Sequence, residues 1–404
     1  MMKRQMLHIA FFFFTLTALT GVWLRLYVFS DAVKITDYPY ILHGHSHIAV
    51  LGWTFFSAFL LLVFFLGQAS SNSVSVLIGL LVVVTIPMFV AFLIQGYALY
   101  SIIFSTLHIF VQYLVAYFVI KHTRKNDAVP GVIRRFIYGA IVMLIISSIG
   151  PFALGAIAAN GLRNEPVFDM AVYFYLHFQY NGWLTLILFG LFLFILERKN
   201  IAYREKWFTY SFWIYTISLF PGYFLSVLWH DFGSFGQLAA IIGAIGQLVG
   251  VSFFIAGILQ LRGPFKRNVS PFVRFHVHAV LLLLFVKSVL ELGLLYPPLA
   301  NLVYETRSIV VGYLHLTLLG FISLFFITQF LLIGLLHENG LIKVGAAIFF
   351  VGFIVNELVL FLSGLYTWLG YGSLPLNQEL LLLASILLLA GIVAVWGSVT
   401  VKKA

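Results

Sequence analysis

Three histidines of this chain stand in the same local pattern, and their side chains are well suited to bind a metal ion or a haem iron. His47, His177 and His315 are each followed by Gly at the fifth position and by Trp or Phe at the sixth, which gives H-x-x-x-x-G-[WF]. Neutral histidine is a common axial ligand of haem iron and a good ligand of copper. A single histidine in a membrane is more often a hydrogen-bonded packing residue, but three equivalent copies favour cofactor binding.

The spacing of the three copies predicts an internal repeat. They lie 130 and 138 residues apart, at positions 47, 177 and 315, and each lies near the start of a long apolar run. Self-similarity at a nearly fixed period indicates a repeated structural unit. We expect one transmembrane domain over residues 1–404, built from repeats at approximately 1–133, 134–267 and 268–404.

Composition places the chain in a membrane. Hydrophobic residues make up 62% of the sequence and charged residues only 9%, so too few polar side chains exist to cover a water-soluble surface. The absence of cysteine excludes disulfides, thiolate metal sites and c-type haem attachment, which leaves metal chemistry to histidine. The net charge of +10 does not indicate nucleic acid binding, because the charges lie in short loops at helix ends.

Apolar runs long enough to cross a bilayer predict an all-α, polytopic fold with twelve transmembrane helices in three four-helix arcs. The marked histidines then fall on helices 2, 6 and 10, about 9 to 12 Å below the outer boundary at 1.5 Å per residue. The expected spans are approximately 8–30, 41–67, 75–95, 98–120, 135–158, 169–196, 207–229, 235–261, 273–296, 308–336, 341–366 and 379–399.

Basic residues predict the orientation. With the N-terminus inside, only Lys34, Arg163 and Arg307 of the 23 Lys and Arg residues lie in outer segments, and Arg25 and Lys287 lie within spans. The other 18 lie in inner segments, which is the asymmetry of the positive-inside rule. We therefore expect an integral protein of the bacterial cytoplasmic membrane with both termini in the cytoplasm.

The glycine of each motif is expected to serve helix packing. In an α-helix the i+5 position lies roughly 140° around the axis from the histidine, and a missing side chain lets a neighbouring helix approach closely. Pro151, Pro221, Pro297 and Pro298 are expected to mark kinks or helix ends within a single bundle.

Twelve helices in three arcs, with histidines entering from the outer side of helices 2, 6 and 10, resemble subunit I of the haem–copper oxidase superfamily, which includes the nitric oxide reductases. The resemblance covers the whole topology, whereas the sequence match is confined to the short histidine segments. It implies a haem of the b type, and it allows a copper ion. It also implies electron transfer, or chemistry or sensing of a small gas such as oxygen or nitric oxide, with companion redox subunits or a quinol or cytochrome donor as partners.

Residue by residue, the resemblance assigns ligands as follows. In the family, helices 2 and 10 each give one histidine to a low-spin haem, which matches His47, or its neighbours His45 and His43, and His315. A helix 6 histidine of the family binds copper, which matches His177. A helix 1 arginine of the family pairs with a haem propionate or formyl group, which matches Arg25, although an arginine so near the boundary can also snorkel to the headgroups.

Two departures put oxygen reduction in doubt. Helix 10 has Tyr313-Leu314-His315, so the family's second histidine two residues away is absent. Helix 7 lacks an interior pair of histidines and offers only His230 at its outer end. The binuclear centre of an oxidoreductase of this type is therefore incomplete, and His108 and His230 are the remaining metal-ligand candidates for a rearranged site.

Two buried ionisable sites leave other functions open. Lys287 and Glu291, spaced i,i+4, are expected to pair with each other, with a proton path as the alternative. Glu357 beside Asn356 has no cationic partner in the sequence and is a candidate proton-handling carboxylate. A twelve-helix secondary transporter without haem remains the alternative function, and an accessory subunit without chemistry of its own is a third.

Overall fold

A computed structural model describes residues 2–399, and within this range every regular element is helical. Eleven of the described helices are long and apolar enough to cross a membrane. The predicted all-helical membrane fold is therefore confirmed, and the protein is an integral membrane protein.

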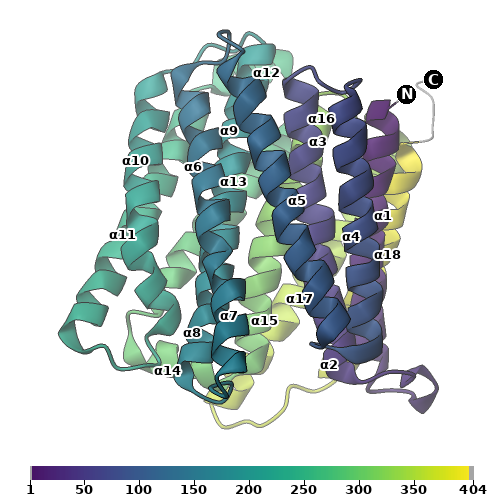
Figure 1. Cartoon of the computed structure of the whole chain (residues 1–404), viewed down its shortest axis with the longest axis vertical. Coiled ribbons are helices and arrows are strands. Elements are labelled where there is room, and N and C mark those ends of the chain that lie inside the picture. The colour runs from purple at the N-terminus through teal and green to yellow at the C-terminus, as the bar shows by residue number, and fades with distance from the viewer. Residues whose placement is uncertain (1, 400–404) are drawn as a thin grey trace. The chain divides into compact units, whose positions relative to one another are not determined.

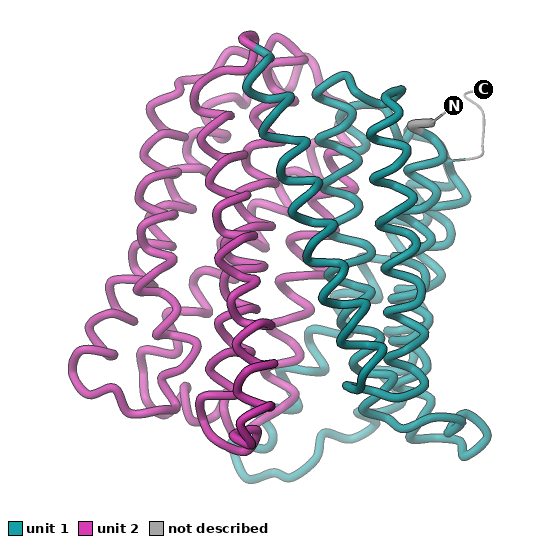
Figure 2. Tube along the Cα trace, in the orientation of Figure 1, with its two compact units in different colours: residues 1–126, 330–404 teal, residues 127–329 magenta. Residues whose placement is uncertain are grey.

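The chain forms two compact units, which Figure 2 shows in different colours. Unit 1 comprises residues 1–126 and 330–404, and unit 2 comprises residues 127–329. Unit 1 therefore joins the two ends of the chain, and its helices α1 and α18 pack against each other. The first boundary lies near the expected repeat boundary at 133, whereas the second lies inside helix α16 (Leu324–Leu332) rather than near 267.

The helices of unit 1 bring the first histidine motif against the N-terminal helix, since η2 packs on α1 and α2 packs on both α1 and α4 (Figure 1). In chain order these elements are α1 (Met2–Leu26), η1 (Asp31–Val33), α2 (Tyr38–His47), η2 (Ile48–Thr54), α3 (Phe55–Phe65), α4 (Asn72–Gln95), α5 (Leu99–Arg124), α17 (Gly340–Trp368) and α18 (Asn377–Ser398).

Unit 2 holds the other two motifs, and its η3 and η5 are in contact with each other. Its elements are α6 (Gly131–Ser147), α7 (Ile149–Ala159), α8 (Pro166–Leu176), η3 (His177–Leu184), α9 (Thr185–Arg198), α10 (Glu205–Gly222), η4 (Tyr223–Val227), α11 (Gly233–Leu259), α12 (Arg262–Asn268), α13 (Pro271–Gly293), α14 (Pro297–Glu305), α15 (Arg307–His315) and η5 (Leu316–Ser323).

The expected span at 207–229 accounts for the difference between the twelve predicted spans and the eleven membrane-length apolar helices of the structure. This segment forms α10, of 18 residues, followed by the 3-10 helix η4, and it is not among the eleven membrane-length apolar helices. Tyr, Trp, Ser and Thr in α10 make it less apolar than a purely aliphatic span. The twelve-helix count and the three-arc arrangement stay predictions.

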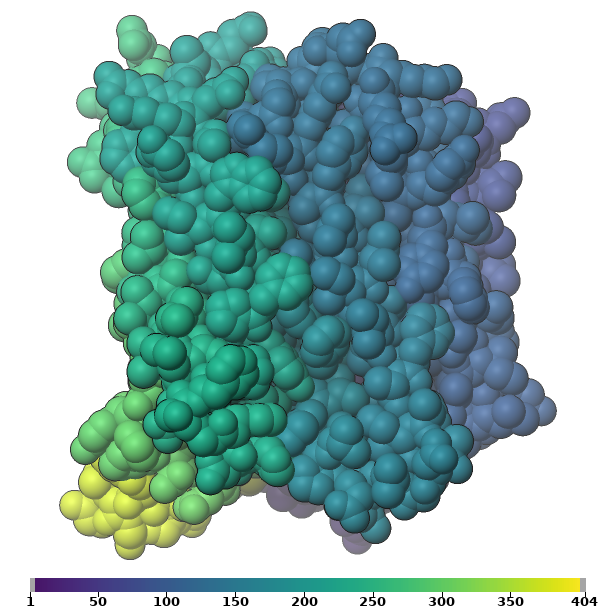
Figure 3. Space-filling model, turned by 60° about the vertical axis from the view of Figure 1, so that its left-hand side comes forward, coloured from purple at the N-terminus to yellow at the C-terminus, as the bar shows by residue number. Residues whose placement is uncertain are grey.

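Large apolar side chains nevertheless cover the outer surface of α10 and α11, which is the teal part of the face in Figure 3. Apolar surface of this extent is unfavourable in water and suits contact with lipid. The exposed side chains are Tyr210, Trp213, Ile217 and Phe220 on α10, and Phe235, Leu238, Ile241, Ile242, Ile245 and Val249 on α11.

The prolines lie where the sequence predicted breaks. Pro151 lies in the first turn of α7, directly after α6 ends. Pro221 lies at the end of α10, and Pro297 begins α14. Proline at the first position of a helix is favourable because its missing N–H would have no partner there.

All three histidine motifs coincide with the three π-helices of the described chain. The π-helices are η2, η3 and η5, and His47 and His315 directly precede theirs while His177 begins its own. A π-helix is defined by i→i+5 hydrogen bonds, occurs mostly as a single turn inside α-helices, and is frequent at functional sites. The α-helical angle of about 140° between histidine and glycine therefore does not apply in these turns.

Two of the three motif glycines, Gly52 and Gly182, allow close packing, as expected. A Cβ on Gly182 would lie 2.8 Å from the Cβ of Met143 in α6. One on Gly52 would lie 3.0 Å from Ile48 Cδ1 and 3.2 Å from the Phe13 ring in α1. A larger residue at either position would push the neighbouring helix away.

A hydroxyl residue ends each π-helix or directly follows it, and binds one of its carbonyl oxygens. Thr54 donates to Val50 O at 2.6 Å, Thr185 to Tyr180 O at 2.8 Å, and Ser323 to Leu318 O at 2.7 Å. Widening of a helical turn interrupts the i→i+4 bonds, and these hydroxyl groups supply partners for the carbonyls concerned. The repeated pattern thus extends one or two residues beyond the aromatic position.

The helices that carry the three motifs begin one to three residues before the expected apolar spans. The three helices start at Tyr38, Pro166 and Arg307. At 1.5 Å per residue, His47, His177 and His315 are roughly 14, 17 and 12 Å from these starts.

Candidate functional site

His45 in α2 is held in one orientation by the N-terminal helix. Its Nδ1 lies 3.0 Å from the carbonyl oxygen of Thr17 and 3.1 Å from Thr20 Oγ1, both in α1. A carbonyl oxygen only accepts, so Nδ1 carries the proton. The Nε2 lone pair is then available, and no described residue hydrogen-bonds to it. This is the tautomer and orientation that a metal-ligating histidine requires.

His47 has a similar arrangement with a different second partner. Its Nδ1 lies 2.9 Å from the carbonyl oxygen of His43, one turn earlier in α2. Its Nε2 lies 3.0 Å from the hydroxyl of Tyr97, which donates to it. A ligand binding at Nε2 must replace this tyrosine, which is about half exposed, at 45%, in the short connection between α4 and α5.

His43 and Arg25 complete the outer part of unit 1. The ring of His43 contacts Tyr97 at 4.5 Å, on the same side of α2 as His47. The side chain of Arg25, in the last turn of α1, makes no hydrogen bond or ion pair with a described residue, and it interacts electrostatically with Tyr38 and His45. An arginine in this situation is available to an external carboxylate or phosphate.

His108 lies on α5 of unit 1, close enough to His47 to interact with it electrostatically. It is fully buried and its ring packs edge to face against Phe55, at 5.7 Å, at the start of α3. Gln112 Nε2 lies 3.1 Å from its Nδ1 and donates to it. Since Nδ1 accepts, the proton is on Nε2 and neither nitrogen presents a free lone pair.

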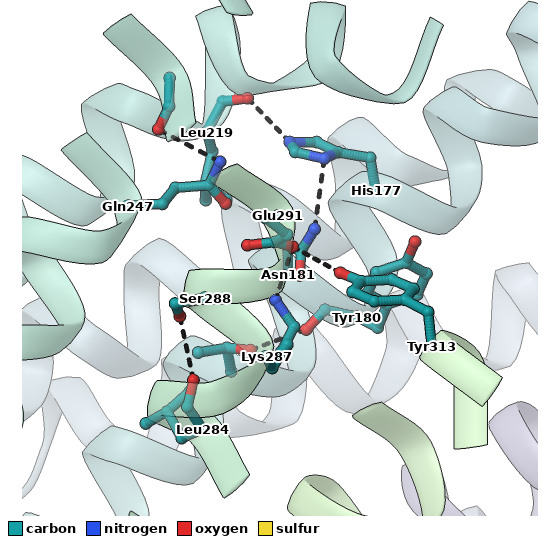
Figure 4. Close-up of polar contacts among 12 residues, drawn as sticks. His177, Tyr180, Asn181, Leu219, Gln247, Leu284, Lys287, Ser288, Glu291 and Tyr313 are labelled. Atoms are coloured by element: carbon teal, nitrogen blue, oxygen red, sulfur yellow. Dashed lines mark hydrogen bonds and ion pairs between the residues drawn. The ribbon is translucent and has the colours of Figure 1, made fainter. Parts of the chain in front are cut away.

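His177 in unit 2 uses both ring nitrogens within the protein. Its Nε2 donates to the carbonyl oxygen of Leu219 in α10 at 2.8 Å, and its Nδ1 accepts from Asn181 Nδ2 at 3.3 Å (Figure 4). The side chain is 1% exposed. Binding of a metal ion at His177 would require one of these hydrogen bonds to break.

A buried ion pair lies in the same unit. Lys287 Nζ is 2.8 Å from Glu291 Oε1, as the i,i+4 spacing in α13 predicted. Tyr313 in α15 donates its hydroxyl to the same oxygen, and Lys287 Nζ also lies 5.8 Å from the centre of the Tyr313 ring. Figure 4 shows these three side chains from two helices pointing toward one another.

The motif that begins at His177 extends this polar cluster. Tyr180 packs against Tyr313 with ring centres 6.3 Å apart. Tyr215 in α10 donates to the carbonyl oxygen of Asn181 at 2.9 Å. His177, Tyr180 and Tyr215 all interact electrostatically with Glu291. The second and third motif helices therefore share one polar region of unit 2.

The remaining histidine candidates do not form a metal cluster. His230 lies between η4 and α11, where its ring contacts Phe232 at 4.9 Å and Trp229 at 6.1 Å. His315 is half-buried at the end of α15. Across residues 2–399, no three side chains of His, Asp and Glu gather closely enough to hold a metal ion. His47 belongs to unit 1 and His315 to unit 2, so their pairing on one haem stays a prediction.

Glu357 in α17 is buried, at 8% exposed. Asn356 donates to its Oε1 at 3.0 Å, while Oε2 has no hydrogen-bond partner among the described residues.

The residues that hold the histidines in place were not predicted from the sequence. Thr17 and Tyr97 come from other helices or connections, and their partners depend on tertiary packing. In the sequence, Tyr313 stands out only because it occupies the position two residues before His315 where the family that the chain resembles has a second histidine. The available signal for Asn181 was its i+4 spacing from His177, which places both on one side of a helix.

No known family model matches the chain, and no curated protein is significantly similar to it.

Proposed function

We propose that the protein is an integral membrane haem-binding protein that resembles the catalytic subunit of the haem–copper oxidases and nitric oxide reductases. It acts in electron transfer or in chemistry or sensing of oxygen or nitric oxide. The observation that carries the proposal is the recurrence of one histidine motif on three membrane-length helices, each with a π-helical turn at the motif. π-Helical turns are frequent at functional sites.

The donor chemistry of unit 1 fits a haem. His45 and His47 each have Nδ1 bonded to a backbone carbonyl, which is the hydrogen bond that fixes the tautomer of an axial histidine. Arg25 has no carboxylate partner and suits a haem propionate. Haem, when bound, supplies redox chemistry or a site for a gas molecule, and these residues bind and orient it.

The donor chemistry for copper fits less well. His177 and His108, two of the expected ligands, accept hydrogen bonds from Asn181 and Gln112 at the nitrogen that would bind the metal, and their other nitrogen carries a proton. The position two residues before His315 holds Tyr313, which is bonded to Glu291. We therefore place electron transfer, gas binding or sensing ahead of oxygen reduction at a binuclear centre.

A secondary transporter without haem is the second candidate. The buried Lys287–Glu291 pair and the buried Glu357 favour it, since ionisable residues inside a membrane often mark substrate or ion pathways. Such a protein would be colourless when purified.

Absorption spectroscopy of the purified full-length protein tests the proposal. We expect a Soret band that shifts on reduction with dithionite. Replacing His315 by Ala should abolish the band of a bis-histidine haem, as should replacing the true ligand among His43, His45 and His47. Replacing His278, an exposed-end histidine of α13, is the matched control and should leave the band unchanged. A folded, colourless wild-type protein would exclude a haem function and favour transport.

A further inference from the structure

We propose that α12 and the start of α13 form a binding site for an anionic phospholipid. The phosphate of the lipid binds to a cluster of basic side chains, and its acyl chains lie along the exposed face of α13. The site consists of Arg262, Lys266 and Arg267 of α12 and of Arg274 and Phe275 of α13. It contains none of the histidines proposed to bind haem, so it does not depend on that function.

Helix α12 lies at the membrane boundary of unit 2. It joins α11 and α13, and both of these helices are long and apolar enough to cross a membrane. Figure 1 shows α12 at the end of the unit 2 helices. A short helix between the ends of two spans lies at the level of the lipid headgroups.

The buried and exposed sides of α12 differ in chemistry. Phe265 is buried, and its ring stacks on Phe192 of α9 with ring centres 6.1 Å apart. Leu261 and Val269, four residues before and after Phe265, are buried as well. The exposed side chains of the helix include Arg262, Lys266 and Arg267. An amphipathic helix with basic residues on its polar side is typical of segments that bind anionic lipids.

The basic residues have no anionic partner within the described part of the chain. Arg262, Lys266, Arg267 and Arg274 form none of the ion pairs of this part, and residues 232–290 contain no Asp or Glu. Arg274 Nη1 donates to the carbonyl oxygen of Lys266 at 2.9 Å, which holds the guanidinium beside α12. A guanidinium has five N–H donors, so the others remain for an external anion.

Membrane orientation alone does not require this arrangement. At this end of unit 2, residues 127–135, 197–206 and 260–274 together contain ten Lys and Arg residues and three Asp and Glu residues. All three acidic residues lie in the first two segments. The positive-inside rule accounts for an excess of basic residues in the loops. It does not account for their collection, without any acidic residue, on the exposed side of one folded helix.

The neighbouring apolar surface identifies the anion as a lipid. Phe275 directly follows Arg274 and is 58% exposed. Leu282, Phe285 and Val289 continue the exposed side of α13 at helical spacing. A nucleic acid or an acidic protein would match only the charges. A phospholipid matches both parts, because its phosphate binds the cations while its acyl chains cover the apolar side of α13.

Native mass spectrometry of the full-length protein in detergent tests the proposal. The protein is titrated with phosphatidylglycerol and with phosphatidylcholine of the same acyl chains. Each cation near an anionic headgroup strengthens binding roughly fivefold. We therefore expect phosphatidylglycerol to bind more tightly than phosphatidylcholine by about tenfold or more. Salt should reduce this preference, because exposed charges are screened.

Two triple variants compare the cluster with an equal loss of charge elsewhere. Arg262→Gln with Lys266→Gln and Arg267→Gln should lower the affinity for phosphatidylglycerol by about tenfold or more. The matched control is Lys121→Gln with Arg124→Gln and Lys125→Gln, which removes three exposed cations at the end of α5 in unit 1. The control should keep the wild-type affinity. Thermal unfolding checks that both variants are folded.

Single variants test the two parts of the site and remain informative if a triple variant does not fold. Arg274→Gln should weaken binding of phosphatidylglycerol and leave binding of phosphatidylcholine unchanged. Phe275→Ala should weaken binding of both lipids, because it removes a contact with the acyl chains. Soluble glycerol 3-phosphate, which has the phosphate but no acyl chains, should not displace the lipid.

Four results would overturn the proposal. The first is equal affinity of the wild type for the two lipids, and the second is wild-type affinity of both the α12 variant and Arg274→Gln for phosphatidylglycerol. The third is an equal loss of affinity in the α5 control, which would show an effect of net charge alone. The fourth is displacement of the lipid by glycerol 3-phosphate together with wild-type binding by Phe275→Ala, which would show a site for free phosphate.

Discussion

At the scale of single residues, the histidines differ in how their ring nitrogens are used. His177 has a donor and an acceptor partner inside unit 2. His45 has a partner for Nδ1 only, from α1. In the sequence, His177 is a motif histidine and His45 is a neighbour of another one, His47. The sequence does not show which residues of other helices form hydrogen bonds with their rings. The distinction between a packed and a ligand-ready imidazole comes from tertiary structure.

The pairing of His177 with Asn181 predicts a stability effect. Replacing Asn181 by Leu removes the donor to His177 Nδ1 and leaves a buried acceptor unpaired, which should cost about 1–3 kcal/mol. Ser46→Ala, at an exposed hydroxyl of α2, should change stability by less than about 0.5 kcal/mol. Thermal unfolding of the purified variants in detergent compares them, and equal midpoints would contradict the assigned hydrogen bond.

Replacing Tyr97 tests whether His47 binds the cofactor or has a structural role. Loss of hydration raises the pKa of Tyr97 to about 12, so its hydroxyl is protonated at neutral pH and donates to His47 Nε2. Tyr97→Phe should cost at most about 1 kcal/mol of stability and should leave the haem content unchanged, since it frees Nε2. Haem assays of Tyr97→Phe and His47→Ala check this. Loss of haem from Tyr97→Phe would show that the tyrosine itself supports the cofactor.

At the scale of helices, the three motifs are sites of altered backbone. The repeat of His, Gly and an aromatic residue was readable from the sequence, and so was the apolar, helical character of the segments. The π-helical turns were not, because their residues fit an α-helical period equally well and the wider turn is favoured by packing. The hydroxyl groups of Thr54, Thr185 and Ser323 are the local signal that was available, and they bind π-helical carbonyls.

The motif glycine of η3 gives a prediction at this scale. Gly182→Ala places a methyl group 2.8 Å from Met143 Cβ in α6, and overpacking of this kind costs about 1–3 kcal/mol. Gly155→Ala, where α7 is open around the Cβ position, should be neutral or stabilising by up to about 1 kcal/mol. The midpoints of thermal unfolding of the two variants measure these effects. A stabilised Gly182→Ala would contradict the close packing of η3 on α6.

At the scale of the whole molecule, composition and apolar runs predicted an integral membrane protein of helices, and the structure agrees. The number of spans was less certain from sequence because α10 mixes aromatic, hydroxyl and aliphatic residues. The two compact units also cross the expected repeats, since the chain's ends pack together as α1 and α18. Such long-range contacts leave no periodic signal in the sequence.

The orientation inferred from basic residues gives a prediction for the whole chain. Because the protein has no cysteine, single cysteines can be labelled selectively. Asn126→Cys, after α5, should react with a membrane-impermeant maleimide only from the cytoplasmic side, and Asn160→Cys, after α7, only from the outer side. Labelling of intact cells and of inverted vesicles measures this. The opposite pattern would reverse the topology, and labelling of both positions from one side would remove the span between them.

The haem content per polypeptide of the purified wild-type protein decides whether this chain is a haem protein. A pyridine haemochrome assay, combined with protein quantification, identifies the haem type and its ratio to the chain. We expect stoichiometric haem b in the wild type and its loss in His315→Ala. A correctly folded chain that binds no haem, even when haem is supplied during expression, would contradict it.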